Sequence, residues 1–286
     1  TQGTWSATIH DIATGQPVSQ ANVLAGAAWP VGISVTVPTT ATPGALDQTI
    51  LTASSANNPA VSDKAWIDTQ APRSVLMVDD DHNQPDVEWF YASALFNNWI
   101  GFDVWDTNFR GSPDASALGA HDAVVWFTGT PWPDTLSPRD ELALAQYLDS
   151  GGRLFLVSQE YLDDAGRTAF SREYLRVATY THNISTTQVT GVVSDPVGGR
   201  LGPYPVLPPA TLSDRLLPLS PASGAFVNQH GGINGVSVDG GAWRTVFLAW
   251  PFENLAQPDA DAVMASTMRW LGVLHQVYLP VVLRSG

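Results

Sequence analysis

The sequence contains no cysteine, and this single absence excludes several kinds of chemistry. Disulfide bonds, thiolate nucleophiles and cysteine-ligated zinc are all ruled out. Lysine is almost missing as well, because Lys64 is the only one and the other basic residues are arginines. No apolar run approaches the roughly 18 residues that a membrane-spanning helix needs, so we expect no membrane insertion.

Positive charge is also scarce, and the imbalance restricts the partners of the chain. The 286 residues include 27 acidic and 13 basic ones, which gives a formal net charge of −14. A phosphate backbone or an anionic lipid surface would be repelled, so neither nucleic acid nor a membrane is an expected partner. Hydrophobic residues make up 44%, which is enough for the packed core of one large domain or two ordinary ones.

Residues 1–71 have the pattern of a small all-β module. Residues 33–38 (ISVTVP) alternate apolar and polar side chains, as a half-buried strand does. Further strands are expected at 48–54 and 65–69, and no helical period is present. We therefore predict an immunoglobulin-like β-sandwich module. It would be truncated, since a full domain of this type has about 100 residues.

Strand and helix patterns alternate from residue 72 to residue 274. The first apolar run, 74–78, ends in three aspartates, as expected of a buried parallel strand. Later strands are expected at 102–105, 123–127, 154–157, 235–238 and 245–250. Helices are expected over 86–99, 137–150 and 259–271. This order predicts an α/β fold with a flavodoxin-like, mostly parallel, doubly wound sheet.

Two parts of the chain fall outside this alternation. Proline and glycine are dense between residues 179 and 232, where we expect an irregular or β-rich insertion. Residues 275–286 form a C-terminal tail that begins with the apolar string HQVYLPVVL, and we expect it to dock as an extended segment.

Several segments resemble the class I glutamine amidotransferase-like fold, in the variant found beside secreted bacterial proteases. They are VLMVDDD (75–81), FDVWDTN (102–108), HDAVVWFTG (121–129), YLDSGGRLFLVSQ (147–159) and FLAWPFENL (247–255). Residues 35–55 resemble the end of an immunoglobulin-like module, and residues 277–284 resemble the C-termini of exported proteins of Chloroflexus-type bacteria. The resemblance implies the extracellular C-terminal region of a secreted protease, subtilisin-like or immune-inhibitor-A-like.

The catalytic pattern of that family is incomplete here. The resemblance places its nucleophilic cysteine directly after the strand at 154–157, where this chain has Ser158, Gln159 and Glu160. The family's His-Pro-Glu would fall at 250–253, where Glu253 matches the acid and no histidine precedes it. The resemblance thus implies a non-catalytic accessory or interaction region. Its partner would be the parent protease domain, a serine-type peptidase, and a protein or polysaccharide substrate.

A hydrolase is the first alternative. Ser158 would be the nucleophile, with His182 or His230 as its base, and the chemistry requires a hydrogen bond between the two side chains. The surrounding LVSQEY is not the G-x-S-x-G turn of many hydrolases, and a serine at a strand end often caps the next helix. Gln159, Glu253 and the acids after the first strand would complete this site.

A calcium site is the second alternative, and calcium is the only candidate cofactor. Asp79, Asp81 and Asn83 have the i, i+2, i+4 spacing that opens a calcium loop, and His82 lies among them. The match then ends, because Gln84 replaces the turn glycine and the bidentate glutamate is missing. In the other interpretation, Asp81 or a neighbour accepts N–H groups of its own loop and the remaining acids are solvated.

A carbohydrate-binding role is the third alternative. Trp132 lies in a loop that should face the loop of residues 79–81, and an exposed indole there could stack on a sugar or clamp a peptide. Packing between the flanking prolines is the competing explanation. The remaining aromatic pattern places four tryptophans on core-facing positions: Trp89, Trp99, Trp126 and Trp270.

Overall fold

The computed structural model describes residues 3–23, 29–38, 40–41, 45–70, 75–208 and 212–273. The chain divides into two compact units, residues 1–72 and residues 73–286. No helix in the described ranges is both long and apolar enough to cross a membrane. The tail at 275–286, which we expected to dock, lies outside the described residues.

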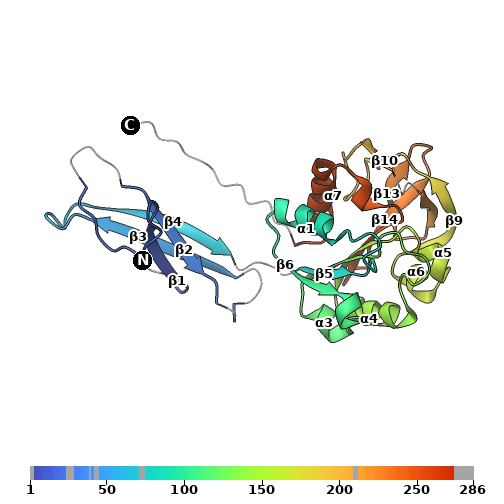
Figure 1. Ribbon diagram of the computed structural model, residues 1–286, viewed down its shortest axis with the longest axis horizontal. Helices are drawn as coiled ribbons and strands as arrows, with labels where there is room; N and C mark the ends of the chain where they lie inside the picture. The colour runs from blue at the N-terminus through green and yellow to red at the C-terminus, as the bar shows by residue number, and fades with distance from the viewer. Residues whose placement is uncertain are drawn as a thin grey trace. The chain divides into compact units, whose positions relative to one another are not determined.

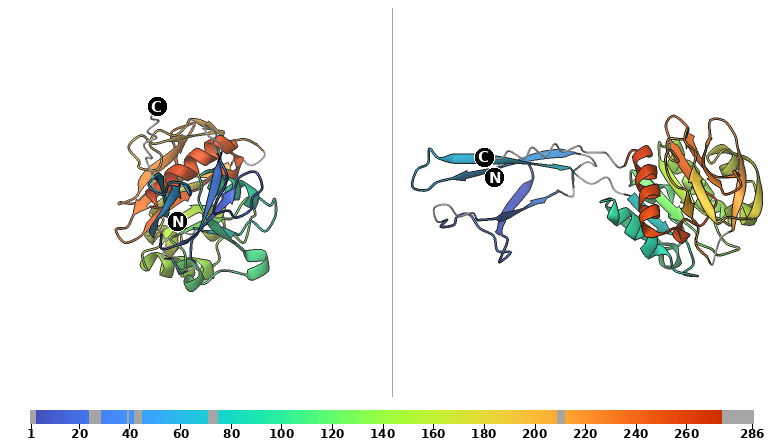
Figure 2. Two further views of the ribbon diagram at one scale, coloured as in Figure 1. Left: turned by 90° about the vertical axis from the view of Figure 1, so that its left-hand side faces the viewer. Right: turned by 90° about the horizontal axis from the view of Figure 1, so that it is seen from above.

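The N-terminal unit consists of two separate antiparallel ribbons (Figure 2). One pairs β1 (Ser6–Asp11) with β2 (Val31–Thr36), and the other pairs β3 (Leu46–Ser54) with β4 (Ser62–Gln70). Strand β1 was not expected from the sequence. None of the apolar side chains described in this unit is fully buried, so the immunoglobulin-like sandwich stays a prediction.

The second unit is built on one mixed, nine-stranded sheet with the order β11-β10-β13-β14-β15-β8-β7-β5-β6. Five strands run parallel: β5 (Val75–Asp79), β6 (Phe102–Asp106), β7 (Ala123–Phe127), β8 (Arg153–Val157) and β15 (Arg244–Leu248). Four are antiparallel: β10 (Gln188–Gly191), β11 (Tyr204–Pro205), β13 (Ser223–Asn228) and β14 (Ile233–Asp239). We expected a mostly parallel sheet. That prediction is wrong for the half of the sheet that contains these four antiparallel strands.

The error arises in the segment 179–232. It was expected to be irregular or β-rich, and it is an ordered β-rich segment that supplies three of the antiparallel strands. It also contains most of β9 (Val177–Ser185), which pairs with β12 (Leu212–Pro218) in a separate two-stranded sheet. Short strands rich in proline and glycine show little periodicity, so only long-range pairing reveals them.

The five parallel strands stand in the order second, first, third, fourth, fifth. This is the order of flavodoxin-like sheets, in which the chain switches direction between the first and third strands. Here those strands are β5 and β7, and every residue of both is buried. Their aliphatic runs are buried because helices cover both faces of the sheet.

The helices lie in two layers, one on each face of the sheet (Figure 1). One layer contains α1 (Glu88–Asn97) and α7 (Gln257–Trp270), and the other contains α3 (Ala115–Gly119), α4 (Pro138–Asp149), α5 (Tyr161–Ala165) and α6 (Ala169–Glu173). Two short elements, α2 (Thr107–Arg110) and the 3-10 helix η1 (Phe252–Asn254), follow β6 and β15. Fully burying one large apolar side chain contributes about 1.5–3 kcal/mol, so each layer stabilises the sheet strongly.

Helix α4 confirms the sequence-based prediction of its start. Ser137 is the N-cap, and it exchanges hydrogen bonds with Asp140 in a capping box, while Pro138 occupies the first helical position. The helix ends before Gly151, whose φ of +95° suits glycine. A cap of this kind contributes about 1 kcal/mol and fixes where the helix begins.

Two of the four tryptophans that we predicted to face the core are exposed instead. Trp89 is 64% exposed and Trp99 is 94% exposed. The buried residues of helix α1 are Phe90, Tyr91, Ala94 and Leu95. Trp89 lies next to this buried face and points away from the core. Trp99 lies beyond the end of the helix, at a positive φ of 59°. Trp126 is buried as expected, and Trp270 packs against the core while only partly buried.

Candidate functional site

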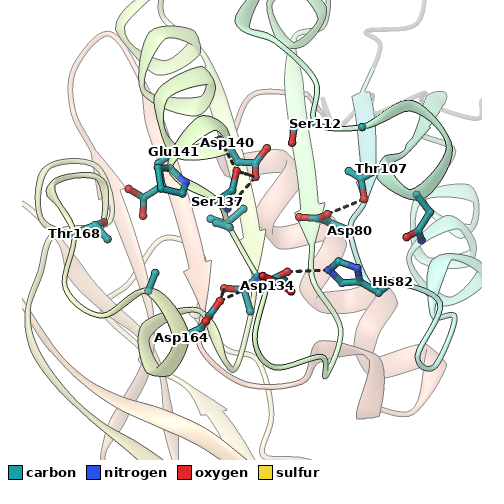
Figure 3. A pocket seen from close by; sticks show the side chains of 16 residues that line it. Asp80, His82, Thr107, Ser112, Asp134, Ser137, Asp140, Glu141, Asp164 and Thr168 are labelled. Carbon is teal, nitrogen blue, oxygen red and sulfur yellow. Dashed lines mark hydrogen bonds between the residues drawn. The ribbon is translucent and has the colours of Figure 1, made fainter.

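The carboxyl ends of the parallel strands meet at one edge of the sheet, where doubly wound folds bind ligands. A pocket of about 520 Å³ opens there on the side of α3 to α6 (Figure 3). It lies between the loop after β5, the start of α2, the loop that leads into α4, and the segment from α5 to α6. The pocket therefore collects residues from four connections that are far apart in the sequence.

Asp80 forms one wall of this pocket. Its side chain is 7% exposed, and it accepts hydrogen bonds from the hydroxyl of Thr107 (2.7 Å) and from the indole Nε1 of Trp126 (3.0 Å). Burial raises the pKa of Asp80 to about 6, although both hydrogen bonds act in the opposite direction. The carboxylate is thus fixed in position and has a higher proton affinity than an ordinary aspartate.

Asp140 forms a second wall from the first turn of α4. One oxygen, Oδ2, accepts from the backbone N–H (2.9 Å) and the hydroxyl (2.5 Å) of Ser137. The other oxygen, Oδ1, is buried and has no hydrogen-bond partner, and the whole residue is only 4% exposed. A buried carboxylate oxygen without a donor is unfavourable, so this atom lacks the hydrogen-bond donor that its burial requires.

Two further acids of the pocket, Glu141 and Asp164, accept hydrogen bonds from neighbouring hydroxyl groups. Tyr161 donates its hydroxyl hydrogen to Oε1 of Glu141 at 2.5 Å. Asp164 accepts from both the backbone N–H and the hydroxyl of Thr135, each at 2.9 Å. These contacts orient carboxylates that would otherwise rotate freely at the surface.

A separate acidic group lies at the end of β5. Ligand oxygens of Asp79, Asp81 and Asp86 all lie within 4.8 Å of one another, so these residues could hold a cation. Asp79 is 1% exposed, its Oδ2 has no hydrogen-bond partner, and burial together with the charge of Asp81 raises its pKa to about 8. Two of these residues, Asp79 and Asp81, belong to the predicted calcium set, and Asp86 was not predicted.

Asp81 accepts N–H groups of its own loop, as the alternative to a calcium site predicted. Its Oδ1 accepts the backbone N–H of Asn83 and its Oδ2 accepts that of Val87, both at 2.6 Å. Asn83 therefore contributes its backbone to the loop. The other acids of the cluster are not all solvated, because Asp79 is buried as deeply as Asp81.

Ser158 is buried between β8 and the start of α5. Its Oγ accepts the hydroxyl hydrogen of Thr128 (2.7 Å) and the backbone N–H of Tyr161 (3.2 Å) at the start of α5. In the part of the chain that the structure describes, no histidine bonds to it. His182 pairs instead with Asp163 at 2.7 Å, and His230 is exposed in a different hollow beside Arg215 and Gly232.

The residues after Ser158 belong to another buried polar group. Gln159 donates from Nε2 to Glu160 Oε1 at 3.2 Å, while its own Oε1 has no hydrogen-bond partner. Burial and the charge of Glu160 raise the pKa of Asp214, on β12, to about 8. Asp214 was not found from the sequence, because β12 reaches Gln159 and Glu160 only through the fold.

Glu253 is hydrogen-bonded to Tyr91 of helix α1. Its Oε2 accepts the hydroxyl hydrogen of Tyr91 at 2.8 Å, and its Oε1 is shielded from solvent without a hydrogen-bond partner. Burial raises the pKa of this carboxyl group. The family's acid is therefore present in sequence, yet its bonded partner here is a tyrosine.

The loop of Trp132 faces the loop after β5, as expected. His82 Nε2 lies 2.8 Å from the carbonyl oxygen of Asp134, and Thr130 donates to the carbonyl oxygen of Gln84. Trp132 itself is 61% exposed, so packing between prolines does not describe it. It does not line the pocket, whereas His82 does.

The pocket residues Asp80, Thr107, Asp140, Glu141 and Asp164 were not predicted as one site. Each follows a different parallel strand or belongs to the helix after it, and only the strand order brings them together. A signal was present, since polar residues after successive parallel strands must share one edge of the sheet.

The sequence matches no family model and no curated protein. Similar solved structures include a GMP synthase-like protein from Thermoplasma acidophilum, with 12% identity, a TM-score of 0.46, and coverage of 69% of this chain and 94% of that one. A ThuA-like protein from Parabacteroides merdae has 13% identity, a TM-score of 0.47, and coverage of 73% and 93%. A β-galactosidase from Halorubrum lacusprofundi has 18% identity and a TM-score of 0.46, and the match covers 70% of this chain but 30% of the enzyme.

Proposed function

We propose that residues 75–273 form a non-catalytic binding module with a class I glutamine amidotransferase-like fold. In this proposal it is an accessory or interaction region of a secreted, subtilisin-like protease. The protease context is suggested by the sequence resemblance, and the absence of catalysis is suggested by the site.

The observation that carries the proposal is the environment of Ser158. A serine hydroxyl becomes a nucleophile when a base accepts its proton. The partners of Ser158 Oγ are a hydroxyl group and a backbone N–H group, and both donate to it. Neither group is a base that could take the proton of a reacting serine, so the position that holds the family's nucleophile is a structural one in this proposal.

The same edge of the sheet retains a binding site. The pocket is open to solvent, and its carboxylates are held by Thr107, Ser137 and Tyr161. Preorganised polar groups in a concave site favour binding, because little side-chain entropy is lost when a ligand arrives. A pocket without an activated nucleophile fits recognition better than turnover.

A second candidate function is cation binding at Asp79, Asp81 and Asp86. It is favoured by their mutual spacing and by the unpartnered Oδ2 of the buried Asp79. Oxygen ligands of this kind suit calcium. This role would stabilise the loop after β5 and is compatible with a binding module.

The test uses the full-length secreted protein, expressed with and without residues 75–273. We expect hydrolysis of a small chromogenic peptide to be unchanged by the deletion, while hydrolysis of a folded protein substrate falls several-fold. The chain alone should release no ammonia from glutamine and should not hydrolyse esters, peptides or glycosides. Turnover by the chain alone would overturn the proposal, and so would a full-length protein that lacks a protease domain.

A further inference from the structure

The pocket beside α4 is strongly acidic. Five acidic residues line it, Asp80, Asp134, Asp140, Glu141 and Asp164, and neither lysine nor arginine is among the lining residues (Figure 3). Three arginines lie next to lining residues in the sequence, and none of them lines the pocket. Arg110 stacks on the Trp105 ring at 3.7 Å from the centroid, Arg139 is exposed on the first turn of α4, and Arg167 donates to the carbonyl oxygen of Ala178 at 2.8 Å.

One of these carboxylates lacks a donor. Both described hydrogen bonds to the carboxylate of Asp140 end on Oδ2, and the buried Oδ1 of this lining residue is left without a partner. Among the described residues, the hydrogen bonds of Glu141 and Asp164 also end on one oxygen of each carboxylate. The site therefore presents acceptors that need N–H or O–H donors from a ligand.

The spacing of these acids argues against a single metal ion. Among the described residues, the one group of three acids or histidines whose ligand atoms approach within 4.8 Å of one another is Asp79, Asp81 and Asp86. The pocket carboxylates do not form such a group. Their separation suits a ligand whose donors are spread over several atoms.

The lining also argues against a neutral sugar. No phenylalanine, tyrosine or tryptophan is among the residues that line the pocket, so a pyranose ring would lack the large aromatic surface on which sugars stack. Trp132, the exposed tryptophan of the neighbouring loop, lies outside the lining. The interactions that this lining offers a ligand are therefore electrostatic attraction and hydrogen bonding.

We propose that this pocket binds an organic cation, through ammonium or guanidinium groups that donate hydrogen bonds to Asp140, Glu141 and Asp80. The inference rests on the proposed binding function and specifies its ligand. A guanidinium group donates in a planar fork and an ammonium group donates three hydrogens, so either can reach more than one of these oxygens. The source is a free amine or a basic side chain of a peptide.

The experiment is isothermal titration of the whole chain at pH 7.5 and low salt. The probes are spermidine, the blocked peptide acetyl-Gly-Arg-Gly-amide, maltotriose and calcium chloride. Asp140→Asn and Glu141→Gln each remove one charge from the pocket, and the exposed Asp63→Asn of the N-terminal unit is the matched control. Thermal unfolding is recorded for every variant. Glu141→Gln provides a second variant if Asp140→Asn does not fold, because Asp140 also caps α4.

We expect spermidine, the arginine peptide or both to bind, with an affinity that falls about tenfold or more in either pocket variant and is unchanged in Asp63→Asn. Binding of spermidine alone would identify a free amine as the ligand, and binding of the peptide would identify a basic side chain. Binding should also weaken as salt increases.

The inference is overturned if neither cation binds, if binding is unchanged in both pocket variants, or if calcium alone binds. Maltotriose binding that depends on Asp140 would also overturn it, while the proposed binding role would stand. The proposed function would be overturned by a different result, catalytic turnover of a substrate by the chain alone. The two failures are therefore distinguishable.

Discussion

Thr128 at the end of β7 donates its hydroxyl hydrogen to Oγ of Ser158 at the end of β8, across 2.7 Å. Both side chains are about 1% exposed. The bond joins two neighbouring parallel strands at the edge where their loops begin. It holds the serine hydroxyl in a dry, structural position, away from any described histidine.

Replacement of Ser158 by alanine should therefore reduce stability. The change removes the hydrogen bond from the backbone N–H of Tyr161 and leaves the buried hydroxyl of Thr128 without its acceptor, so we expect a loss of roughly 1–3 kcal/mol in the free energy of unfolding. Urea denaturation followed by tryptophan fluorescence measures it. A Ser158→Ala protein as stable as the parent would show that these bonds contribute nothing.

The buried acid Asp79 should make stability depend on pH. Its folded pKa of about 8 lies above the ordinary value of 3.8, so between those values the folded state holds a proton that the unfolded chain has lost. Stability then falls as the pH rises through this window. Asp79→Asn, which is never charged, should gain roughly 1–3 kcal/mol over the parent at pH 8 and almost nothing near pH 4.

Exposed Asp63→Asn is the control for this comparison, since its change should be small at both pH values. A bound cation would produce a different result. If millimolar calcium raised the unfolding temperature of the parent chain but not that of Asp79→Asn, the proton would be replaced by a metal ion, and Asp79, Asp81 and Asp86 would be its ligands.

Gly129 should not tolerate a side chain. Its φ is +59°, and a Cβ atom would lie 2.9 Å from Cβ of Asp81. Gly129→Ala must move the two loops apart, so we expect a loss of about 2 kcal/mol or more, combining backbone strain with overpacking. Differential scanning fluorimetry measures the shift. The matched control is Gly111→Ala, which has a similar φ of +67° and nothing within 4 Å; equal losses in both would remove the steric explanation.

The features predicted correctly from the sequence are those decided by local chemistry. The apolar runs of β5 and β7 and the cap of α4 at Ser137 are local patterns. The antiparallel half of the sheet was missed because its pairing is long-range. The error at Trp89 came from assigning this residue to the core, although it lies beside the apolar face of α1. The pocket was missed for the same reason as the sheet, since Asp80 and Asp140 become neighbours only through strand order.

Labelling of the chain with a serine-directed fluorophosphonate tests the central claim, that this sheet edge binds without catalysing. The probe reacts with a serine whose hydroxyl is activated by a base, and a subtilisin in the same tube shows that it is active. Peptide mass spectrometry should find Ser158 unmodified in the folded chain after the subtilisin is fully labelled. A stoichiometric adduct on Ser158 would contradict the account.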